Sequence, residues 1–164
     1  MKKSLRERSP LVYVLVALIP YSKPNLLLAY KPSQFFRELE KISRYKQSTL
    51  RKAYDRGVSR GLIERLSRAP KLTPLGQRKI ALYVATRLGK NASLMVIFDI
   101  PEARADDRRY LRTLLRQLDF EQAQKSVWIS RYDFRDVLVQ AVKELDLDGC
   151  VEIHESARTY PRLS

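Results

Sequence analysis

Positive charge in this chain of 164 residues is concentrated in its first half, and this asymmetry predicts two domains with different surfaces. Residues 1–92 hold 21 Lys and Arg against 5 Asp and Glu, a net charge of +16. Residues 93–164 hold 11 against 13, a net charge of −2, which brings the whole chain to +14. Such an excess repels itself in a compact fold unless a polyanion or salt neutralises it. We therefore expect the first half to bind nucleic acid, the alternative being a merely soluble basic surface.

The single cysteine and the single histidine exclude several kinds of site. Cys150 has no second cysteine with which to form a disulfide within the chain, which fits a reducing cytoplasm. Together with His154 it is also too little for a Cys/His zinc cluster. We expect a cytoplasmic protein without a cofactor, in which neither residue carries out chemistry.

An apolar run near the N-terminus has the superficial features of a signal peptide. Residues 11–19 are apolar and follow several cations, but they are far fewer than the roughly 20 residues needed to span a bilayer. Ser9 and Pro10 instead make a favourable helix start, with Ser as N-cap and Pro at the first helical position. We expect a buried helix over residues 9–19 and no membrane partner.

The segment from Ser48 to about Arg60 is predicted to be a helix with two unlike faces, ending at Gly61. Spaced at 100° per residue, one face is small and apolar: Leu50, Ala53, Tyr54, Gly57 and Val58. The other face carries hydroxyl groups, cations and a single acid: Ser48, Thr49, Arg51, Lys52, Asp55, Arg56 and Ser59. An ordinary surface helix would mix more acids with its cations. This composition is typical of a helix that lies in a groove lined by phosphates.

The elements around this helix complete a winged helix-turn-helix over residues 1–90. A helix over 34–43, capped by Ser33, is expected to bury Phe35, Phe36, Leu39 and Ile42. The remaining elements are a short helical segment over 25–30, strands over 61–66 and 71–73 joined by a turn, and a helix from Thr73-Pro74 to about Leu88.

Ten residues of this half are candidates for contacts with DNA. Those expected to read base edges are Ser48, Thr49, Lys52 and Arg56. Those expected to contact phosphates, from the turn, the helix and the wing, are Arg44, Lys46, Arg51, Arg65, Arg68 and Lys71.

The second half is predicted to form a β-α-β-β-α-β ferredoxin-like domain over residues 93–158, which makes the chain α+β. The continuous apolar run 94–98 is typical of a buried central strand. A helix follows to Leu118, with Asp106 and Asp107 in its first turn, where the helix dipole favours negative charge. Its buried stripe is expected to include Tyr110, with its arginines pointing outward. Strands over 120–123 and 125–130, a helix over 134–145 and a strand over 150–154 complete the order.

Several motifs resemble those of known families. The runs Arg60-Gly61-Leu62-Ile63-Glu64 and Lys71-Leu72-Thr73-Pro74-Leu75-Gly76 resemble the winged helix of many bacterial transcriptional regulators. The runs 96–102 (Val-Ile-Phe-Asp-Ile-Pro-Glu) and 124–130 (Gln-Lys-Ser-Val-Trp-Ile-Ser) resemble the CRISPR-associated protein two family and the central domain of PaaX-like regulators. The resemblance covers about residues 34–156, and the winged helix favours the regulator.

Resemblance to the PaaX-like family implies a sequence-specific regulator of transcription that binds double-stranded DNA, with repression as the expected outcome. We expect a homodimer through residues 93–158, with its two winged helices on a two-fold-symmetric site. Half-sites would then lie about 34–36 Å, or a multiple of that distance, apart.

The CRISPR-associated family implies a different function, a metal-dependent nuclease or a spacer-integration subunit with an added DNA-binding domain. Asp99 ends the first strand where that family places a metal-binding carboxylate, and two copies across a dimer axis would hold one Mg²⁺. Only Glu102 is close enough in sequence to assist. The simpler interpretation is that Asp99 accepts backbone N–H groups in the loop 100–105, and that the protein is not an enzyme.

RNA binding is a third possibility, because charge alone does not separate DNA from RNA. Modules that read RNA sequence expose aromatic side chains on a sheet. In the basic half Phe35, Phe36 and Tyr54 all fall on apolar helix faces, so a role in the core is expected for them instead.

Overall fold

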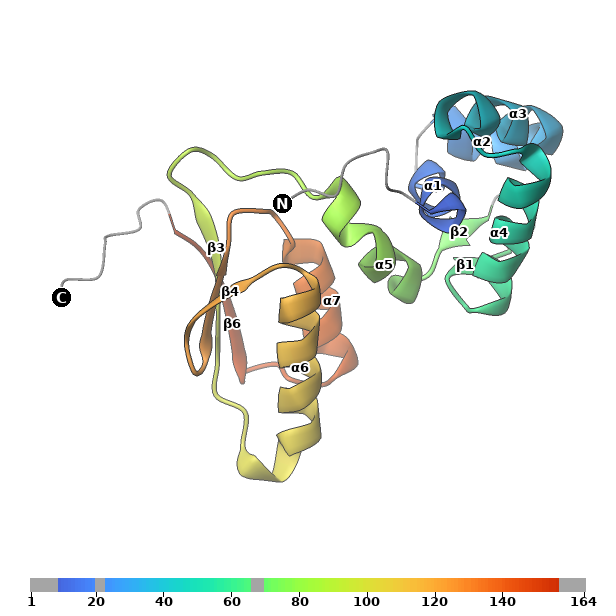
Figure 1. Cartoon of the computed structure of the whole chain (residues 1–164). Helices are drawn as coiled ribbons and strands as arrows, with labels where there is room; N and C mark the ends of the chain where they lie inside the picture. The colour runs from blue at the N-terminus through green and yellow to red at the C-terminus, as the bar shows by residue number, and fades with distance from the viewer. Residues whose placement is uncertain (1–8, 20–22, 66–69, 157–164) are drawn as a thin grey trace. The chain divides into compact units, whose positions relative to one another are not determined.

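A computed structural model describes residues 9–19, 23–65 and 70–156 (Figure 1). The chain forms two compact units, Met1–Val84 and Ala85–Ser164. The fold class is the predicted one, α+β, with helices in the first unit and a four-stranded antiparallel sheet with helices in the second.

The first unit contains five helices and a two-stranded ribbon in its described residues. The helices are α1 (Pro10–Ala17), α2 (Lys23–Tyr30), α3 (Pro32–Ser43), α4 (Gln47–Ser59) and α5 (Pro74–Val84). The ribbon is formed by β1 (Ile63–Glu64) and β2 (Lys71–Leu72), which pair antiparallel with Ile63 opposite Leu72. This is the element order predicted for a winged helix-turn-helix.

The core of the first unit is built around α1. This helix packs against α3, α4 and α5, and Ser9 caps its start by accepting the Val12 backbone N–H at 3.4 Å. Leu15, Phe35 and Leu50, from three different helices, are fully buried. The apolar run at residues 11–19 is therefore explained by core packing.

Helix α3 differs from its prediction at both ends. It begins at Pro32 with Lys31 as N-cap, so the predicted Ser33 cap is wrong. Ile42, predicted to be buried, is 66% exposed. The buried face continues from Leu39 to Ser43 instead, a spacing of four residues, and this turns Ile42 toward solvent.

Helix α5 ends at Val84 and not near Leu88 as predicted, because residues 86–88 form backbone hydrogen bonds with residues 131–133 of the second unit. The Leu88 N–H donates to the Arg131 carbonyl at 2.9 Å, and the Asp133 N–H donates to the Thr86 carbonyl at 2.9 Å. These bonds hold residues 86–88 extended, so they cannot continue the helix.

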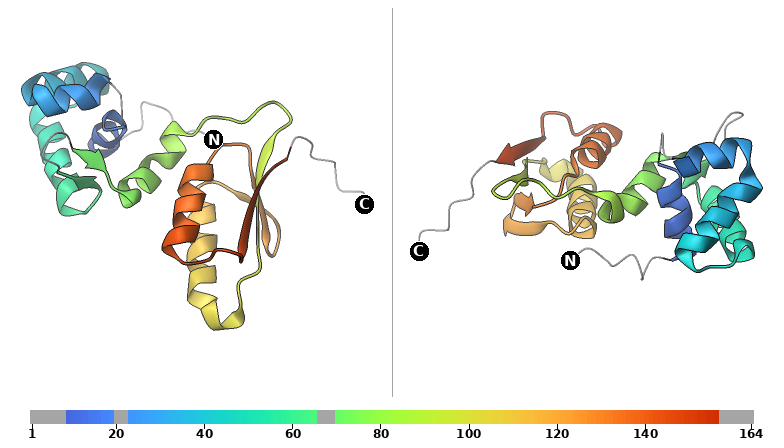
Figure 2. Two further views of the ribbon diagram at one scale, coloured as in Figure 1. Left: turned by 180° about the vertical axis from the view of Figure 1, so that it is seen from behind. Right: turned by 90° about the horizontal axis from the view of Figure 1, so that it is seen from above.

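The second unit is the predicted ferredoxin-like fold. Its strands are β3 (Ser93–Phe98), β4 (Glu121–Gln124), β5 (Val127–Ser130) and β6 (Val151–Ser156). They form one sheet in the order β4-β5-β3-β6, with every neighbouring pair antiparallel. Helices α6 (Ala105–Gln117) and α7 (Arg135–Glu144) lie on the same face of the sheet, and a short 3₁₀ turn, η2 (Glu102–Arg104), precedes α6 (Figures 1 and 2).

Strand alternation separates a helix-covered sheet face from an outer face. Leu94 and Trp128 are buried toward the helices, where Leu111 of α6 and Leu138 of α7 are also fully buried. Tyr110 of α6 is 43% exposed, so its predicted place in the buried stripe is wrong. The stripe is narrower and consists of Leu111, Leu114, Leu115 and Leu118.

The start of α5 approaches the ribbon so closely that only glycine fits at position 76. A Cβ atom on Gly76 would lie 2.2 Å from the Leu62 carbonyl oxygen. The neighbouring Thr73 hydroxyl accepts the Gly76 N–H at 3.1 Å and donates to the Gly61 carbonyl at 2.6 Å. This confirms Thr73 as the predicted cap of α5 and ties the helix start to the ribbon.

Replacing Gly76 by Ala is therefore expected to lower the free energy of unfolding by about 1–3 kcal/mol, because the backbone must move apart to admit the methyl group. Denaturant unfolding of the full chain measures this. Gly89→Ala is the matched control, since nothing lies within 4 Å of its added Cβ and its φ is not positive. Equal stability of the two variants would contradict the close approach.

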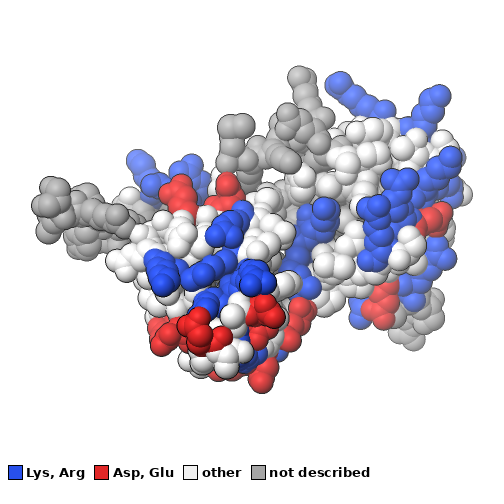
Figure 3. Space-filling view, turned by 60° about the horizontal axis from the view of Figure 1, so that its bottom comes forward, with Lys and Arg blue, Asp and Glu red and all other residues white. Residues whose placement is uncertain are grey.

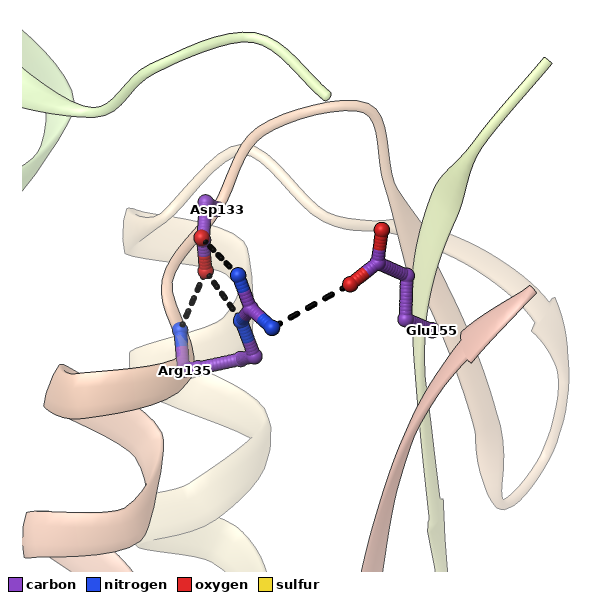
Figure 4. A network of polar contacts seen from close by, with 3 residues as sticks. All are labelled: Asp133, Arg135 and Glu155. Atoms are coloured by element: carbon purple, nitrogen blue, oxygen red, sulfur yellow. Dashed lines mark hydrogen bonds and ion pairs between the residues drawn. The ribbon is translucent and has the colours of Figure 1, made fainter. Parts of the chain in front are cut away.

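A polar network fixes the start of α7 (Figure 4). Asp133 Oδ1 accepts the Arg135 backbone N–H at 3.1 Å and the Arg135 Nε–H at 2.9 Å, and the same guanidinium reaches Glu155 Oε2 at 3.2 Å. The hydrogen bonds from Arg135 hold the pKa of Asp133 below its ordinary value of 3.8. The ionised carboxylate is thus favoured by the folded state.

A lowered pKa means that this stabilisation is complete above pH 4 and is lost as the pH falls through the folded-state value. Asp133→Asn is expected to cost about 0.5–1 kcal/mol of unfolding free energy near neutral pH. The difference from the wild type should shrink on acidification below about pH 4. Urea unfolding at a series of pH values measures it, and a difference that does not change with pH would contradict the charge-dependent part.

Candidate nucleic-acid interface

The four predicted base-reading residues lie on one exposed face of α4. Ser48, Thr49, Lys52 and Arg56 are all exposed, whereas Leu50, Ala53 and Gly57 of the same helix are buried. The single acid of this face, Asp55, is also exposed. The structure therefore has the two unlike faces that the sequence predicts, and whether the exposed one reads bases stays a prediction.

Gly57 lets α4 approach its neighbours closely on the buried side. A Cβ atom at this position would lie 2.7 Å from Ile63 Cδ1 in the ribbon and 3.3 Å from Leu11 Cδ1 in α1. The small face of α4 therefore packs against both the ribbon and α1, and the polar face of the helix is exposed to solvent.

The turn before α4 carries two predicted phosphate contacts, Arg44 and Lys46, and both are exposed. Arg44 ends α3 in the left-handed conformation, with φ at 62°. Glu40 of α3 holds the turn from the other side, since its carboxylate accepts the Gln47 backbone N–H at 3.3 Å and the Gln47 Nε2–H at 2.8 Å. A carboxylate at the first turn of α4 satisfies an open N–H and suits the helix dipole.

Arg51 and Arg65 are held over aromatic rings, which the sequence did not predict. The Arg51 guanidinium carbon lies 4.5 Å from the centre of the Phe36 ring, and that of Arg65 lies 5.5 Å from the centre of the Tyr54 ring. Together with neighbouring residues they line an open hollow of about 350 Å³. Stacking of this kind orders a guanidinium while its edge stays available for phosphate.

Two wing cations are each paired with an acid. Arg65 Nη2 lies 2.9 Å from Asp55 Oδ1, and Lys71 Nζ lies 3.2 Å from Glu64 Oε2, directly across the ribbon. All four side chains are about half exposed or more, so both pairs are weak and can exchange for phosphate contacts. Arg68, the remaining wing residue, lies outside the described residues.

The charge distribution in space follows the one along the chain. Lys and Arg side chains of the first unit far outnumber its acidic ones on the face drawn in Figure 3, whereas the second unit shows both signs there. Among the described residues, no helix is both long and apolar enough to cross a membrane.

Asp99, the alternative metal ligand, follows β3 and is exposed. Its backbone N–H donates to the Cys150 carbonyl at 2.9 Å. Within residues 9–19, 23–65 and 70–156 its carboxylate accepts no hydrogen bond, so the predicted bonds to the 100–105 loop are not found there. In the same residues no three Asp, Glu, His or Cys side chains are grouped as metal ligands. Glu102, the possible helper, is bound instead to Arg108 at 3.1 Å.

Comparison with known proteins relates the second unit to a described family. Residues 94–163 match the family model described as the PaaX protein central Cas2-like domain. The second unit is therefore similar to that central domain, and it is called the PaaX domain below after this similarity. The predicted resemblance to PaaX-like regulators is confirmed for this part of the chain, and none of the curated proteins compared with it matches significantly.

A search of solved structures finds an uncharacterized protein, Rv0674, from Mycobacterium tuberculosis. It is 22% identical, with a TM-score of 0.35, and the alignment covers 93% of this chain and 62% of that one. The present chain thus spans less than two thirds of the length of that protein.

The two motifs that carry the predicted resemblance lie on the sheet of the second unit. Residues 96–102 fall on β3, the turn after it and the start of η2, and residues 124–130 fall on the end of β4, the turn after it and β5. Sequence reasoning missed Glu40, Phe36 and Tyr54 as positioning residues of the basic unit. Of the three, Glu40 alone has its partner nearby in the chain, because its carboxylate accepts the backbone N–H of Gln47, seven residues later, at the start of α4. An acid shortly before a predicted helix start is therefore the one sequence signal that could have found it.

Glu40→Gln is expected to lower the free energy of unfolding by about 0.5–1 kcal/mol, because the charge at the start of α4 is lost. Denaturant unfolding measures the change. Glu38→Gln is the matched control, because this half-exposed residue is paired with Lys41 of its own helix and, among the residues that the structure describes, with no other cation. A loss of stability no greater than that of the control would show that Glu40 does not hold α4.

Proposed function

We propose that this protein is a sequence-specific transcriptional regulator that binds double-stranded DNA through α4 and the wing. The observation that carries the proposal is the exposed face of α4, with cations and hydroxyl groups and one acid, in a unit that is joined to a PaaX domain. Insertion of such a helix into the major groove would bring Lys52 and Arg56 to base edges. Arg44, Lys46 and Arg51 would then contact phosphates beside it.

DNA is favoured over RNA by the aromatic residues of the basic unit. Phe35 and Phe36 are buried, and Tyr54 is covered by Arg65. None of these three stands on a sheet as a stacking surface for splayed bases, which is how RNA sequence is usually read.

We also propose that the regulator is a homodimer through the outer face of the PaaX domain's sheet. Met95, Ile97, Val127 and Ile129 are neighbours on this face, with Met95 opposite Ile129 and Ile97 opposite Val127. All four are only partly buried within one chain. A second copy would cover this apolar surface and would place two winged helices on a two-fold-symmetric operator, whose occupation would repress transcription by occlusion.

Ile129→Lys is expected to halve the molecular mass measured by light scattering, because each copy would bring an unpaired lysine into the apolar interface. The control is Val139→Lys, which places the same charge at an exposed apolar residue of α7 on the helix-covered side. A wild-type mass equal to one chain, or an Ile129→Lys variant that stays dimeric, would contradict this arrangement.

Arg56→Ala is expected to change which duplexes are selected from a random library, because a base contact is removed. For the wild type, the logarithm of the affinity should fall with the logarithm of salt concentration, with a slope of about 0.9 for each phosphate neutralised. Lys143→Ala, on α7, removes the same charge outside the basic unit and should leave both selection and slope unchanged. An unaltered selection by Arg56→Ala would show that α4 does not read the sequence.

The same incubation tests the metal-dependent alternative. With Mg²⁺ present, the duplex should be retained uncleaved by the wild type and by Asp99→Ala alike. Cleavage that needs Mg²⁺ and is lost in Asp99→Ala would replace the regulator with a nuclease.

A further inference from the structure

Four arginines of α6 share one face of the PaaX domain and take no part in the function proposed above. Arg108, Arg109, Arg112 and Arg116 follow one another at helical spacing and, with Ala105, line an open hollow of about 260 Å³. In Figure 3 the second unit shows a group of Lys and Arg side chains bordered by Asp and Glu. An arginine stripe of this kind is unusual in a half of the chain whose net charge is −2.

Two of these guanidinium groups are ordered by aromatic rings beneath them. The guanidinium carbon of Arg112 lies 5.7 Å from the centre of the Phe98 ring, and that of Arg116 lies 5.6 Å from the centre of the Trp128 ring. A stacked guanidinium loses little further freedom when it binds an anion, because its plane is already set.

The hollow has more positive charge than its acidic neighbours neutralise. Arg108 is paired with Glu102 at 3.1 Å and Arg109 with Asp106 at 3.2 Å. Arg112 and Arg116 have no carboxylate partner among the described residues, and the Arg112 Nε–H is buried there without an acceptor. Within the described part of the chain, the Arg112 guanidinium makes one hydrogen bond, a long one of 3.5 Å from Nη2 to the Lys125 carbonyl oxygen. Unused donors on fixed guanidinium groups suit phosphate oxygens, which accept two N–H bonds from one arginine.

We propose that this hollow binds the phosphate groups of a compact phosphorylated small molecule. Its volume lies below the roughly 300 Å³ at which sites for whole small molecules begin, so it fits an anionic head group whose remainder extends outward. A DNA backbone could offer the same phosphates, but a long duplex would also meet Glu102 and Asp106, which are 93% exposed. The acidic border therefore favours a short polyanion over an extended one.

The single tryptophan provides a local readout, because Trp128 lies beneath Arg116. The full chain is titrated with sodium pyrophosphate at constant ionic strength, and calorimetry gives the affinity while Trp128 fluorescence reports the place. We expect saturable binding with a fluorescence change. In the double variant Arg109→Gln/Arg116→Gln the affinity should fall at least tenfold, whereas Arg131→Gln, an exposed arginine outside the hollow, should bind as the wild type does.

Absence of binding to the wild type, or equal binding by the double variant, would overturn the proposal. Circular dichroism checks that the double variant is folded, which we expect because Arg109 and Arg116 are exposed.

A parallel titration with duplex DNA separates the two sources of phosphate. If the hollow serves a small molecule, pyrophosphate binds equally well with duplex present, and the double variant retains its duplex affinity. If duplex excludes pyrophosphate and the double variant loses duplex binding, the hollow belongs to the DNA backbone and the small-molecule proposal is wrong.

Discussion

Close backbone packing around the ribbon is the constraint on which the basic unit depends. At Gly76 the first turn of α5 lies against the Leu62 carbonyl, and at Gly57 the side of α4 lies against Ile63. The two contacts hold the ribbon between two helices. The Thr73 hydroxyl adds a hydrogen bond to the Gly61 carbonyl, which joins the residue after β2 to the segment before β1. Because these approaches use the small face of α4, the cations of that helix have no place in the core and must face outward.

Electrostatics then distinguishes the two units. In the basic unit the arginines near α4 rest on Phe36 and Tyr54, and the carboxylate of Glu40 lies at the helix start rather than on the exposed face. In the PaaX domain Arg108 and Arg109 are paired with acids, and Arg135 is bound to Asp133 and Glu155. The first arrangement leaves an extended positive surface suited to a polyanion, while the second pairs several arginines with acids and gathers four of them around one hollow.

Patterns with a local cause could be predicted from the sequence. The faces of α4 follow from helical periodicity, the cap at Thr73 from its position before Pro74, and the ferredoxin-like order from the succession of apolar runs. The predictions of the α5 end and of the buried residues Ile42 and Tyr110 were wrong because these features depend on partners distant in the chain. The end of α5 at Val84 is set by pairing with residues 131–133, and the exposure of Ile42 and Tyr110 by which neighbour each helix meets. The stacking of Arg51 on Phe36 joins two helices and has no signature in either one.

The central claim, that α4 and the ribbon form the DNA-binding surface, is tested most directly by amide hydrogen exchange of the full chain with and without a selected duplex. The account predicts slower exchange on DNA binding in residues 44–59 and in β1 and β2, with little direct change in the sheet of the PaaX domain. Protection confined to residues 93–156, with none in α4, would contradict it.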